Sequence, residues 1–251
     1  MKVAQWGSYH GLLHGFMGRR GGQSSGRYAG LNASYHVGDD AKTVSQNVCN
    51  IKQAVGIHEG RIVTMRQVHG DHIIEVNDKT RKEAGAADGM VSAEQGVNIG
   101  VLTADCVPLL LIAPRQKIVA AVHAGWRGTL AGIAAKMVNL FKEKYGVSAK
   151  QVEAALGPSI GACCYEVKED VTTPLIAQWD DLASASLQAR AGKSYLDLRK
   201  FNQGILERTG VPVNQIYHVG PCTSCFPEDF YSYRRERNET GRQISFIGWA
   251  V

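Results

Sequence analysis

Three short apolar segments follow one another in the middle of the chain and are separated by polar islands. They comprise residues 97–103, 109–113 and 117–122, and Pro and Gly lie near their ends. Apolar runs of this length are typical of strands buried on both faces, although a buried helix segment has the same composition. We expect three adjacent strands, with Cys106 and His123 at strand ends, where loops commonly carry chemistry.

Two segments have apolar residues at helical spacing. In residues 38–56, Asp39 and Asp40 lie at the expected N-cap, Gly56 ends the segment, and Cys49 is predicted to be a core residue. In residues 129–146, Thr129 is the expected cap, and the apolar face is Leu130, Ile133, Met137, Leu140 and Phe141. Further helices are expected near residues 168–179, interrupted by Pro174, and over residues 194–210.

The remaining apolar segments predict strands. Residues 61–76 have the pattern strand, tight turn, strand, with Gly70-Asp71 at the turn. Short strands are also expected within residues 85–92, 151–167, 214–225 and 244–251. Several of these strands are too close in sequence for crossover helices. We therefore expect an α+β (mixed α/β) fold, a layered sandwich of mixed β-sheets covered by helices, in a single domain over residues 1–251.

Composition and charge narrow the function only slightly. The chain has 251 residues, 44% hydrophobic and 20% charged, which is an ordinary globular composition. The net charge is +5 and the arginines are scattered rather than packed in blocks, so a solvated basic surface is the simplest interpretation, and an anionic small molecule fits as well as nucleic acid. We find no secretory signal and no apolar stretch of membrane-spanning length. We expect a cytoplasmic protein with reduced or metal-bound thiols.

The main candidate for chemistry is the set His69, Cys106 and His123. Each lies at an expected strand end. Two imidazoles and a thiolate suit a catalytic Zn²⁺ that keeps one coordination position open, and they also match the ligands of a single blue-copper centre. A Cys–His hydrolase dyad is the metal-free alternative. Spacing alone leaves these alternatives open.

Other polar segments have weaker signals. Residues 14–32 are rich in Gly, Ser and Arg, and Arg19 there offers forked donors for phosphate, although a flexible surface loop has the same composition. Asp88 is either a turn residue or an active-site carboxylate. Pro221-Cys222-Thr223-Ser224-Cys225 matches half of the zinc nucleobase-deaminase signature, but the chain lacks the His-x-Glu half. Cys222 and Cys225 are therefore interpreted as structural or as a loosely held redox pair, and the adjacent Cys163 and Cys164 as structural thiols.

Several of these islands together resemble one known family. The chain is similar to the YfiH family, also called the laccase-domain or polyphenol-oxidase family and now assigned as purine nucleoside phosphorylase. The resemblance covers essentially the whole chain, and its most specific motifs are Thr103-Ala104-Asp105-Cys106 and His123-Ala124-Gly125-Trp126-Arg127-Gly128. Supporting matches include Gln67-Val68-His69-Gly70, Ala87-Asp88-Gly89, Gly157-Pro158-Ser159-Ile160-Gly161, Tyr233-Arg234-Arg235 and Leu31-Asn32.

The resemblance implies a layered α/β sandwich like that of a bacterial toxin deamidase, with His69, Cys106 and His123 as the metal ligands. It implies zinc-dependent phosphorolysis of adenosine, inosine and methylthioadenosine to base and ribose 1-phosphate, with adenosine deamination and copper-dependent phenol oxidation as side activities. The expected partners are small molecules, not nucleic acid or membrane, and the expected state is a monomer or weak homodimer. The further residues implicated are Asp105 and Arg127 in catalysis and Arg19, Asn32, Asp88 and Thr129 in substrate binding.

One position departs from the family pattern. The family usually has Asn-Arg in the first helix, where this chain has Asn47-Val48. If that arginine contacts phosphate in relatives, oxidase or hydrolase chemistry gains weight here. Four hypotheses therefore stand: a zinc phosphorylase, a copper phenol oxidase on the same ligands, a cysteine hydrolase or amidase with Cys106 as nucleophile, and a non-catalytic binding domain.

Overall fold

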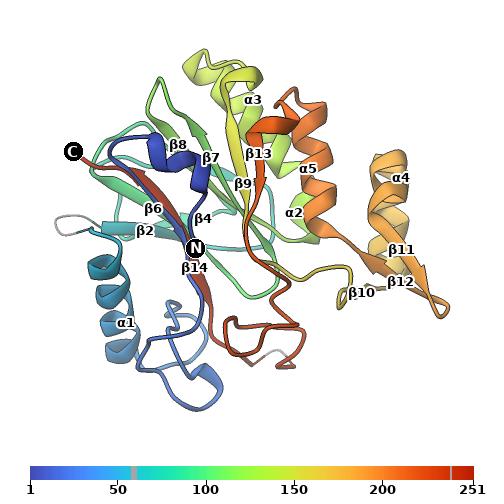
Figure 1. Cartoon of the computed structure of the whole chain (residues 1–251), viewed down its shortest axis with the longest axis horizontal. Coiled ribbons are helices and arrows are strands. Elements are labelled where there is room, and N and C mark those ends of the chain that lie inside the picture. Colours follow the sequence, from blue (N-terminus) through green and yellow to red (C-terminus); the bar gives the residue numbers. More distant parts are fainter. Residues whose placement is uncertain (58–60, 238) are drawn as a thin grey trace.

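Two mixed β-sheets packed face to face form the body of the protein (Figure 1). The computed structural model describes residues 1–57, 61–237 and 239–251. The first sheet has the order β1 (Leu12–Phe16), β14 (Gln243–Trp249), β6 (Val97–Thr103), β2 (Arg61–Arg66), β4 (Glu83–Ala86). The second has the order β13 (Ile216–His218), β9 (Glu153–Leu156), β7 (Val107–Ala113), β8 (Ile118–Ala124), β5 (Gly89–Ser92), β3 (Ile73–Glu75).

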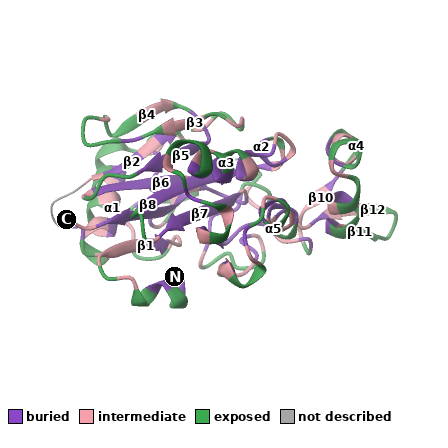
Figure 2. Ribbon diagram, turned by 90° about the horizontal axis from the view of Figure 1, so that it is seen from above, coloured by how far each residue is buried: buried purple, intermediate pink, exposed green. Residues whose placement is uncertain are grey.

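Strands β7 and β8 are buried on both faces, as their uninterrupted apolar sequences predict (Figure 2). Successive side chains of a strand point to opposite faces. Leu110 and Ile112 of β7 accordingly join the core between the two sheets, whereas Leu109 and Leu111 join the core on the outer face. The second sheet is thus an inner layer, packed between the first sheet and the helices on its outer face.

Helices cover the outer faces of both sheets. Helix α1 (Ala41–Ala54) packs on the first sheet, where Ile51 shares a buried hydrophobic cluster with Ile244 and Phe246 of β14. On the second sheet lie α3 (Ile133–Tyr145) and α5 (Leu198–Arg208), whose apolar stripes share one core with β7 and β8. This arrangement confirms the predicted α+β sandwich with helices as its outer layers.

A smaller unit projects beyond the sandwich on the side of α5 (Figures 1 and 2). It combines α4 (Glu169–Ser186) with a three-stranded sheet of β10 (Glu166–Val167), β12 (Lys193–Leu196) and β11 (Leu187–Arg190). Helix α4 continues past Pro174, and its backbone leaves helical geometry at Trp179. Short 3₁₀ helices occupy Ala4–Ser8, Gly26–Tyr28, Ala149–Gln151 and Val213–Gln215.

The predicted helix over residues 129–146 was wrong at its start. Helix α2 (Trp126–Leu130) begins after Gly125, and Gly132, with φ of 74°, separates it from α3. Thr129 therefore lies inside α2 rather than at a cap, and its hydroxyl oxygen accepts a hydrogen bond from Asn202 Nδ2 at 2.8 Å. The left-handed conformation at Gly132 is one that glycine adopts at little cost, so it is where the helical path breaks.

Four further expectations are corrected. Residues 61–76 do not form a hairpin, because β2 joins the first sheet and β3 the second. For the same reason β6 is not adjacent to β7 and β8: it belongs to the opposite sheet. Cys49 is exposed on α1 rather than in the core. The predicted helix over residues 194–210 begins only at Leu198, because residues 194–196 belong to β12.

No helix of the described residues is both long and apolar enough to cross a membrane.

Candidate metal centre and substrate cleft

Two connections that cross from the first sheet to the second meet at one end of the sandwich. The β2–β3 connection carries His69, and the β6–β7 connection carries Cys106. His123 lies near the end of β8, and the β7–β8 register pairs it with Pro108, two residues after Cys106. The fold thus brings together three side chains that are distant in sequence.

The ligand atoms of His69, Cys106 and His123 all lie within 4.8 Å of one another. The two imidazole rings meet edge to face, with centroids 4.9 Å apart. Two imidazole nitrogens and one sulfur at these separations can share a tetrahedral ion and leave its fourth position open. His123 is buried, Cys106 is partly buried and His69 is exposed. The open coordination position of an ion held here would therefore face the solvent-accessible cleft.

Asp88 holds two of the three ligands in place. Its carboxylate accepts hydrogen bonds from the backbone N–H groups of Val68, His69 and Gly70 at 2.7–3.2 Å, and from His123 Nδ1 at 2.8 Å. Three successive N–H groups around one anion form a backbone nest. This nest fixes the loop in which His69 adopts a φ of 59°. The contact with Nδ1 leaves Nε2 of His123 as the nitrogen available to an ion, an arrangement common in metal sites.

Gly125 allows the backbone to pass close to the cluster. A Cβ atom at this position would lie 3.2 Å from Cys106 Sγ and 3.3 Å from His69 Cδ2. These contacts are tighter than ordinary packing, so any larger residue would displace ligands. This accounts for the glycine in the His123-Ala124-Gly125-Trp126 segment.

The electrostatics of the cluster favour a thiolate–imidazolium pair when no ion is bound. Burial raises the pKa of the Cys106 thiol, but the charge of His123 and hydrogen bonds from both imidazoles outweigh it and lower that pKa to about 6. Burial lowers the pKa of His123, but the Cys106 thiolate and Asp88 raise it to about 9. Burial also opposes ionisation of Asp88, yet the hydrogen bond from His123 and the N–H donors bring the pKa of this carboxyl below its usual value.

In metal-free protein, alkylation of Cys106 is therefore expected to speed up as the pH rises through about 6 and to level off above it. The thiolate is the nucleophile, and an ordinary cysteine titrates at about 8.5. The measurement is the iodoacetamide rate at Cys106, followed by peptide mass, across a pH series. A midpoint near that of an ordinary thiol would contradict the paired state.

A cleft of about 830 Å³ opens over the cluster, a size that suits a small-molecule ligand. Trp126, Tyr165 and Tyr233 supply aromatic surface to its wall. Four arginines also line it, namely Arg66, Arg127, Arg234 and Arg242. None of these four guanidinium groups forms an ion pair with a carboxylate of the described residues. Asp105 is the one carboxylate among the described residues that line the cleft, so arginines outnumber carboxylates beside the His–Cys–His cluster.

The predicted catalytic residues occupy different positions. Arg127 lines the cleft, with its guanidinium 4.3 Å from the centre of the Trp126 ring. Asp105 also lines it, but its carboxylate accepts hydrogen bonds from Thr223 Oγ1, Ser232 Oγ and the Arg234 backbone N–H at 2.6–2.9 Å. With three donors on this carboxylate, Asp105 has the geometry of a residue that positions the Cys106 loop.

None of the four predicted substrate-binding residues lines the cleft, and Asp88 is fully buried behind His69 and His123. The Arg19 guanidinium pairs with Glu236 at 2.8 Å and donates to the carbonyl oxygens of Ala29 and Pro227. The buried Asn32 side chain donates to Asp39 Oδ2 at 2.8 Å. Thr129 is buried within α2. The residues that line the cleft are instead drawn from strand ends and loops at this end of the sandwich.

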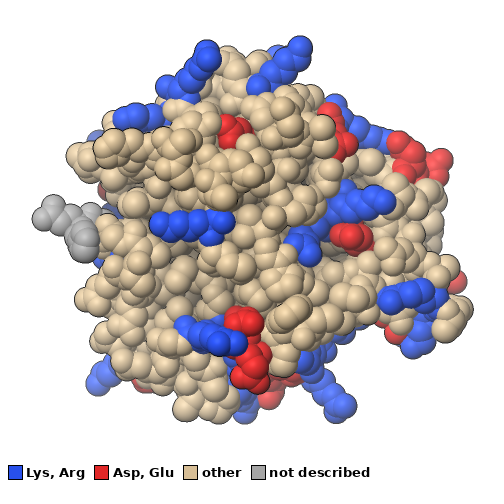
Figure 3. All heavy atoms as spheres, in the orientation of Figure 1, with Lys and Arg blue, Asp and Glu red and all other residues tan. Residues whose placement is uncertain are grey.

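Several cleft residues were missed as site candidates. Arg66 ends β2, directly before the Gln67-Val68-His69 island, so its position at a strand end was the available signal. Tyr165 follows Cys163 and Cys164, and only the fold shows that this loop reaches the cleft. Arg234 and Arg242 were noticed near the C-terminal strand but had no assigned role. The face in Figure 3 shows Lys and Arg side chains scattered among acidic ones, without a continuous basic surface on that face.

The fold and the cluster define the class: an α+β sandwich with a His–Cys–His site at the base of a cationic cleft. The family model described as multi-copper polyphenol oxidoreductase laccase matches residues 13–250. Purine nucleoside phosphorylase YlmD of Geobacillus stearothermophilus is 35% identical, with 96% of this chain and 91% of YlmD covered. Adenosine deaminase RL5, from an unknown prokaryotic organism, is 34% identical over 90% of each chain.

The solved structures agree with the sequence relatives. The crystal structure of a Bacillus licheniformis protein, YfiH, superimposes with a TM-score of 0.90 and 31% identity, covering 98% of this chain and 95% of YfiH. The chain therefore belongs to the YfiH, or laccase-domain, family, as its motifs predicted.

Proposed function

We propose that this protein is a zinc-dependent purine nucleoside phosphorylase that converts adenosine, inosine or methylthioadenosine with phosphate into free base and ribose 1-phosphate. The observation that carries the proposal is the set of four arginines beside the His–Cys–His cluster in one cleft, none of which forms an ion pair with a carboxylate of the described residues. Relatives named purine nucleoside phosphorylase support this activity over the alternatives.

In this reaction a phosphate oxygen forms a bond to C1′ of the ribose, and the bond from C1′ to the purine nitrogen breaks. The leaving base takes the electron pair and gains a proton. Guanidinium groups bind phosphate through two parallel hydrogen bonds, so the cleft arginines are the groups that would hold and orient the nucleophile. Orientation of two reactants in one site lowers the entropic cost of their encounter.

The aromatic wall suits the base of a nucleoside. Tyr165 and Trp126 line the cleft on the side of Arg127 and Arg234, so a base stacked there would have its ribose near the arginines. Among the proton-donor candidates Asp88, Asp105 and Arg127, both carboxylates are already saturated with hydrogen bonds. Arg127 is the one of the three whose side chain remains available to the leaving purine, and it would stabilise the departing base by a hydrogen bond while the proton itself comes from solvent, because a guanidinium is not deprotonated in proteins.

The donor set fits zinc, and His69, Cys106 and His123 would hold it. Bound there, zinc would supply Lewis-acid polarisation of a phosphate oxygen or activation of a water. Activation of water is the chemistry that adenosine deamination needs, and we include deamination in the proposal as a side activity, supported by the relative named adenosine deaminase.

Val48 does not weaken the proposal. It lies on α1, half-buried against the outer face of the first sheet, and is not among the residues that line the cleft. The side chain that replaces the family arginine is therefore not placed to hold phosphate in this cleft, and the cationic groups of the cleft come from other elements.

The direct test is incubation of metal-replete protein with adenosine and phosphate, with the products separated by chromatography. We expect adenine and ribose 1-phosphate in equal amounts, and neither when phosphate is omitted. Absence of product from protein with full metal content would overturn the proposal. Oxygen uptake with phenols by a copper-loaded sample tests the oxidase alternative in the same preparation.

Replacing Arg127 with alanine is expected to raise the KM for phosphate. A hydrogen bond to a charged group contributes about 1.5–3 kcal/mol, which corresponds to roughly 10- to 100-fold. The matched control is Arg115→Ala, because Arg115 is exposed in the turn between β7 and β8, at the opposite end of these strands from Cys106 and His123. An unchanged phosphate KM in Arg127→Ala would place the anion site elsewhere in the cleft.

A further inference from the structure

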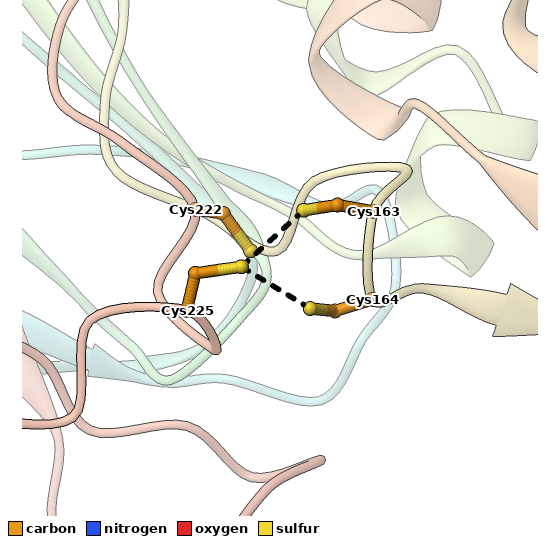
Figure 4. A group of neighbouring side chains, drawn as sticks. All are labelled: Cys163, Cys164, Cys222 and Cys225. Carbon is orange, nitrogen blue, oxygen red and sulfur yellow. Dashed lines mark hydrogen bonds between the residues drawn. The ribbon is translucent and has the colours of Figure 1, made fainter.

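A second cluster of metal-ligating side chains lies outside the His–Cys–His site. The sulfurs of Cys163, Cys164, Cys222 and Cys225 all lie within 4.8 Å of one another (Figure 4). Two loops supply them: one follows β9 and the other follows β13. Because β9 and β13 are parallel neighbours in the second sheet, their loops leave from the same end.

The spacing of the sulfurs is that of a metal site rather than of disulfides. Cys225 Sγ lies 3.5 Å from Cys163 Sγ and 3.4 Å from Cys164 Sγ. A disulfide requires about 2.05 Å between sulfurs. Tetrahedral zinc with bonds of about 2.3 Å to each sulfur separates the sulfurs by about 3.8 Å. Four sulfurs already gathered at nearly that separation need only small shifts to coordinate one ion.

The backbone around the cluster supports this geometry. The Gly161 N–H donates to Cys222 Sγ at 3.2 Å, a contact that stabilises a thiolate. A Cβ atom at Gly161 would lie 3.2 Å from Cys163 Sγ and 3.4 Å from Cys222 Cβ, so glycine allows both loops to approach the same point. The guanidinium of Arg190 donates to the carbonyl oxygen of Ala162, next to Cys163, which brings positive charge to the cluster.

We propose that these four cysteines form a second, structural zinc site. The pair Cys222 and Cys225 has the C-x₂-C spacing common in such sites, whereas the adjacent pair Cys163-Cys164 is an unusual second half. Four protein ligands leave no open position, which is the pattern of a structural rather than a catalytic ion. Each thiol loses its proton to solvent as its sulfur binds the ion, and the oxidation states do not change.

The position of the cluster indicates what the ion would stabilise. Ser159 and Cys222 pair as a β-bridge, and the Thr223 N–H donates to the Ser159 carbonyl oxygen at 3.1 Å. Thr223 also donates its hydroxyl to Asp105, the residue before Cys106 of the His–Cys–His site. Tyr165, which lines the cleft, follows Cys164 directly. An ion that ties the two loops together would therefore support one wall of the substrate cleft.

The test is zinc analysis of protein purified under reducing conditions without chelator. We expect one ion at each cluster in the wild type, hence two per chain. Cys106→Ala should retain the ion of the four-cysteine cluster, whereas Cys164→Ser should lose that ion and keep the ion of the His–Cys–His site. Cys49→Ser is the matched control, because Cys49 is exposed on α1 and belongs to neither cluster, and it should keep both ions. A folded Cys106→Ala protein without zinc would overturn the proposal.

A second measurement does not depend on a cluster variant folding. Cobalt-substituted Cys106→Ala protein should show the intense charge-transfer absorption of four thiolate ligands, because the remaining site is all sulfur. Absence of that absorption, or an intact mass lighter by two hydrogens per disulfide in the protein as purified, would show oxidised or unligated thiols and refute the site. These outcomes are independent of phosphorolysis, so they test the second site even if the proposed activity fails.

Discussion

Replacing Cys106 with alanine is expected to remove both the metal and the activity of the His–Cys–His site. The sulfur is the one anionic ligand of the cluster, and its loss leaves two imidazoles, of which His69 is exposed. A metal contributes several kcal/mol of charge stabilisation in the transition state, so phosphorolysis should fall by at least about 10³-fold. The measurements are metal content and the rate of adenine release.

Two further variants separate a metal ligand from a nucleophile. Cys106→Asp keeps an anionic ligand and should retain metal with reduced activity, whereas a thiol nucleophile would be lost completely. Cys49→Ala should match the wild type, because Cys49 lies on α1 outside both sulfur clusters. Activity of chelated, metal-free protein that a single thiol alkylation abolishes would favour the cysteine hydrolase instead.

The layers of the fold could be predicted because uninterrupted apolar segments indicate strands that are buried on both faces. The uninterrupted apolar sequences of β7 and β8 meet a core on each face, and that double burial requires both a second sheet and covering helices. The sequence could not show that residues 67–72 cross between sheets. A Gly-Asp pair between two apolar segments is as compatible with a crossing loop as with a hairpin turn. Only the observed pairing of β2 with β6 and of β3 with β5 distinguishes the two.

The clustering of His69, Cys106 and His123 could be anticipated because each lies at a strand end, but the surrounding residues could not be assigned. Asp88 had two local interpretations, turn residue or active-site carboxylate, and its contacts with Val68, Gly70 and His123 come from separate segments. Arg19 was placed near the substrate because its charge suits phosphate, yet Glu236, more than two hundred residues later, pairs with it. Such pairings depend on tertiary contacts that no local pattern encodes.

The four-cysteine cluster likewise depends on tertiary contacts that the local sequence does not reveal. In sequence, Cys163-Cys164 and Cys222-Cys225 are separated by 57 residues, and each pair alone is most simply a set of structural thiols. They meet because β9 and β13 are parallel neighbours and both end beside the cleft. The same end of the second sheet carries the His–Cys–His site, so two clusters of side chains that could bind a metal share one supporting framework.

The carboxylate of Asp88 couples the loop of His69 to the ring of His123, so its removal should affect both metal affinity and stability. In Asp88→Asn, an amide N–H₂ group would face at least one of the donors that the carboxylate now satisfies. Loss of such partners beside a metal ligand typically costs 10- to 100-fold in metal affinity. A buried donor left without an acceptor costs about 1–3 kcal/mol, more when the lost acceptor is charged.

We therefore expect Asp88→Asn to bind zinc at the His–Cys–His site roughly 10- to 100-fold more weakly, and its metal-free form to unfold at a lower Tm than the metal-free wild type. Competition with a chelator measures the affinity, and thermal unfolding measures the stability. Asp71→Asn is the control on the same loop, since Asp71 makes only an exposed ion pair with Lys136, a type that contributes about 0–1 kcal/mol. If Asp88→Asn lowered stability but left zinc affinity unchanged, the carboxylate would act on the loop alone and not through the orientation of His123.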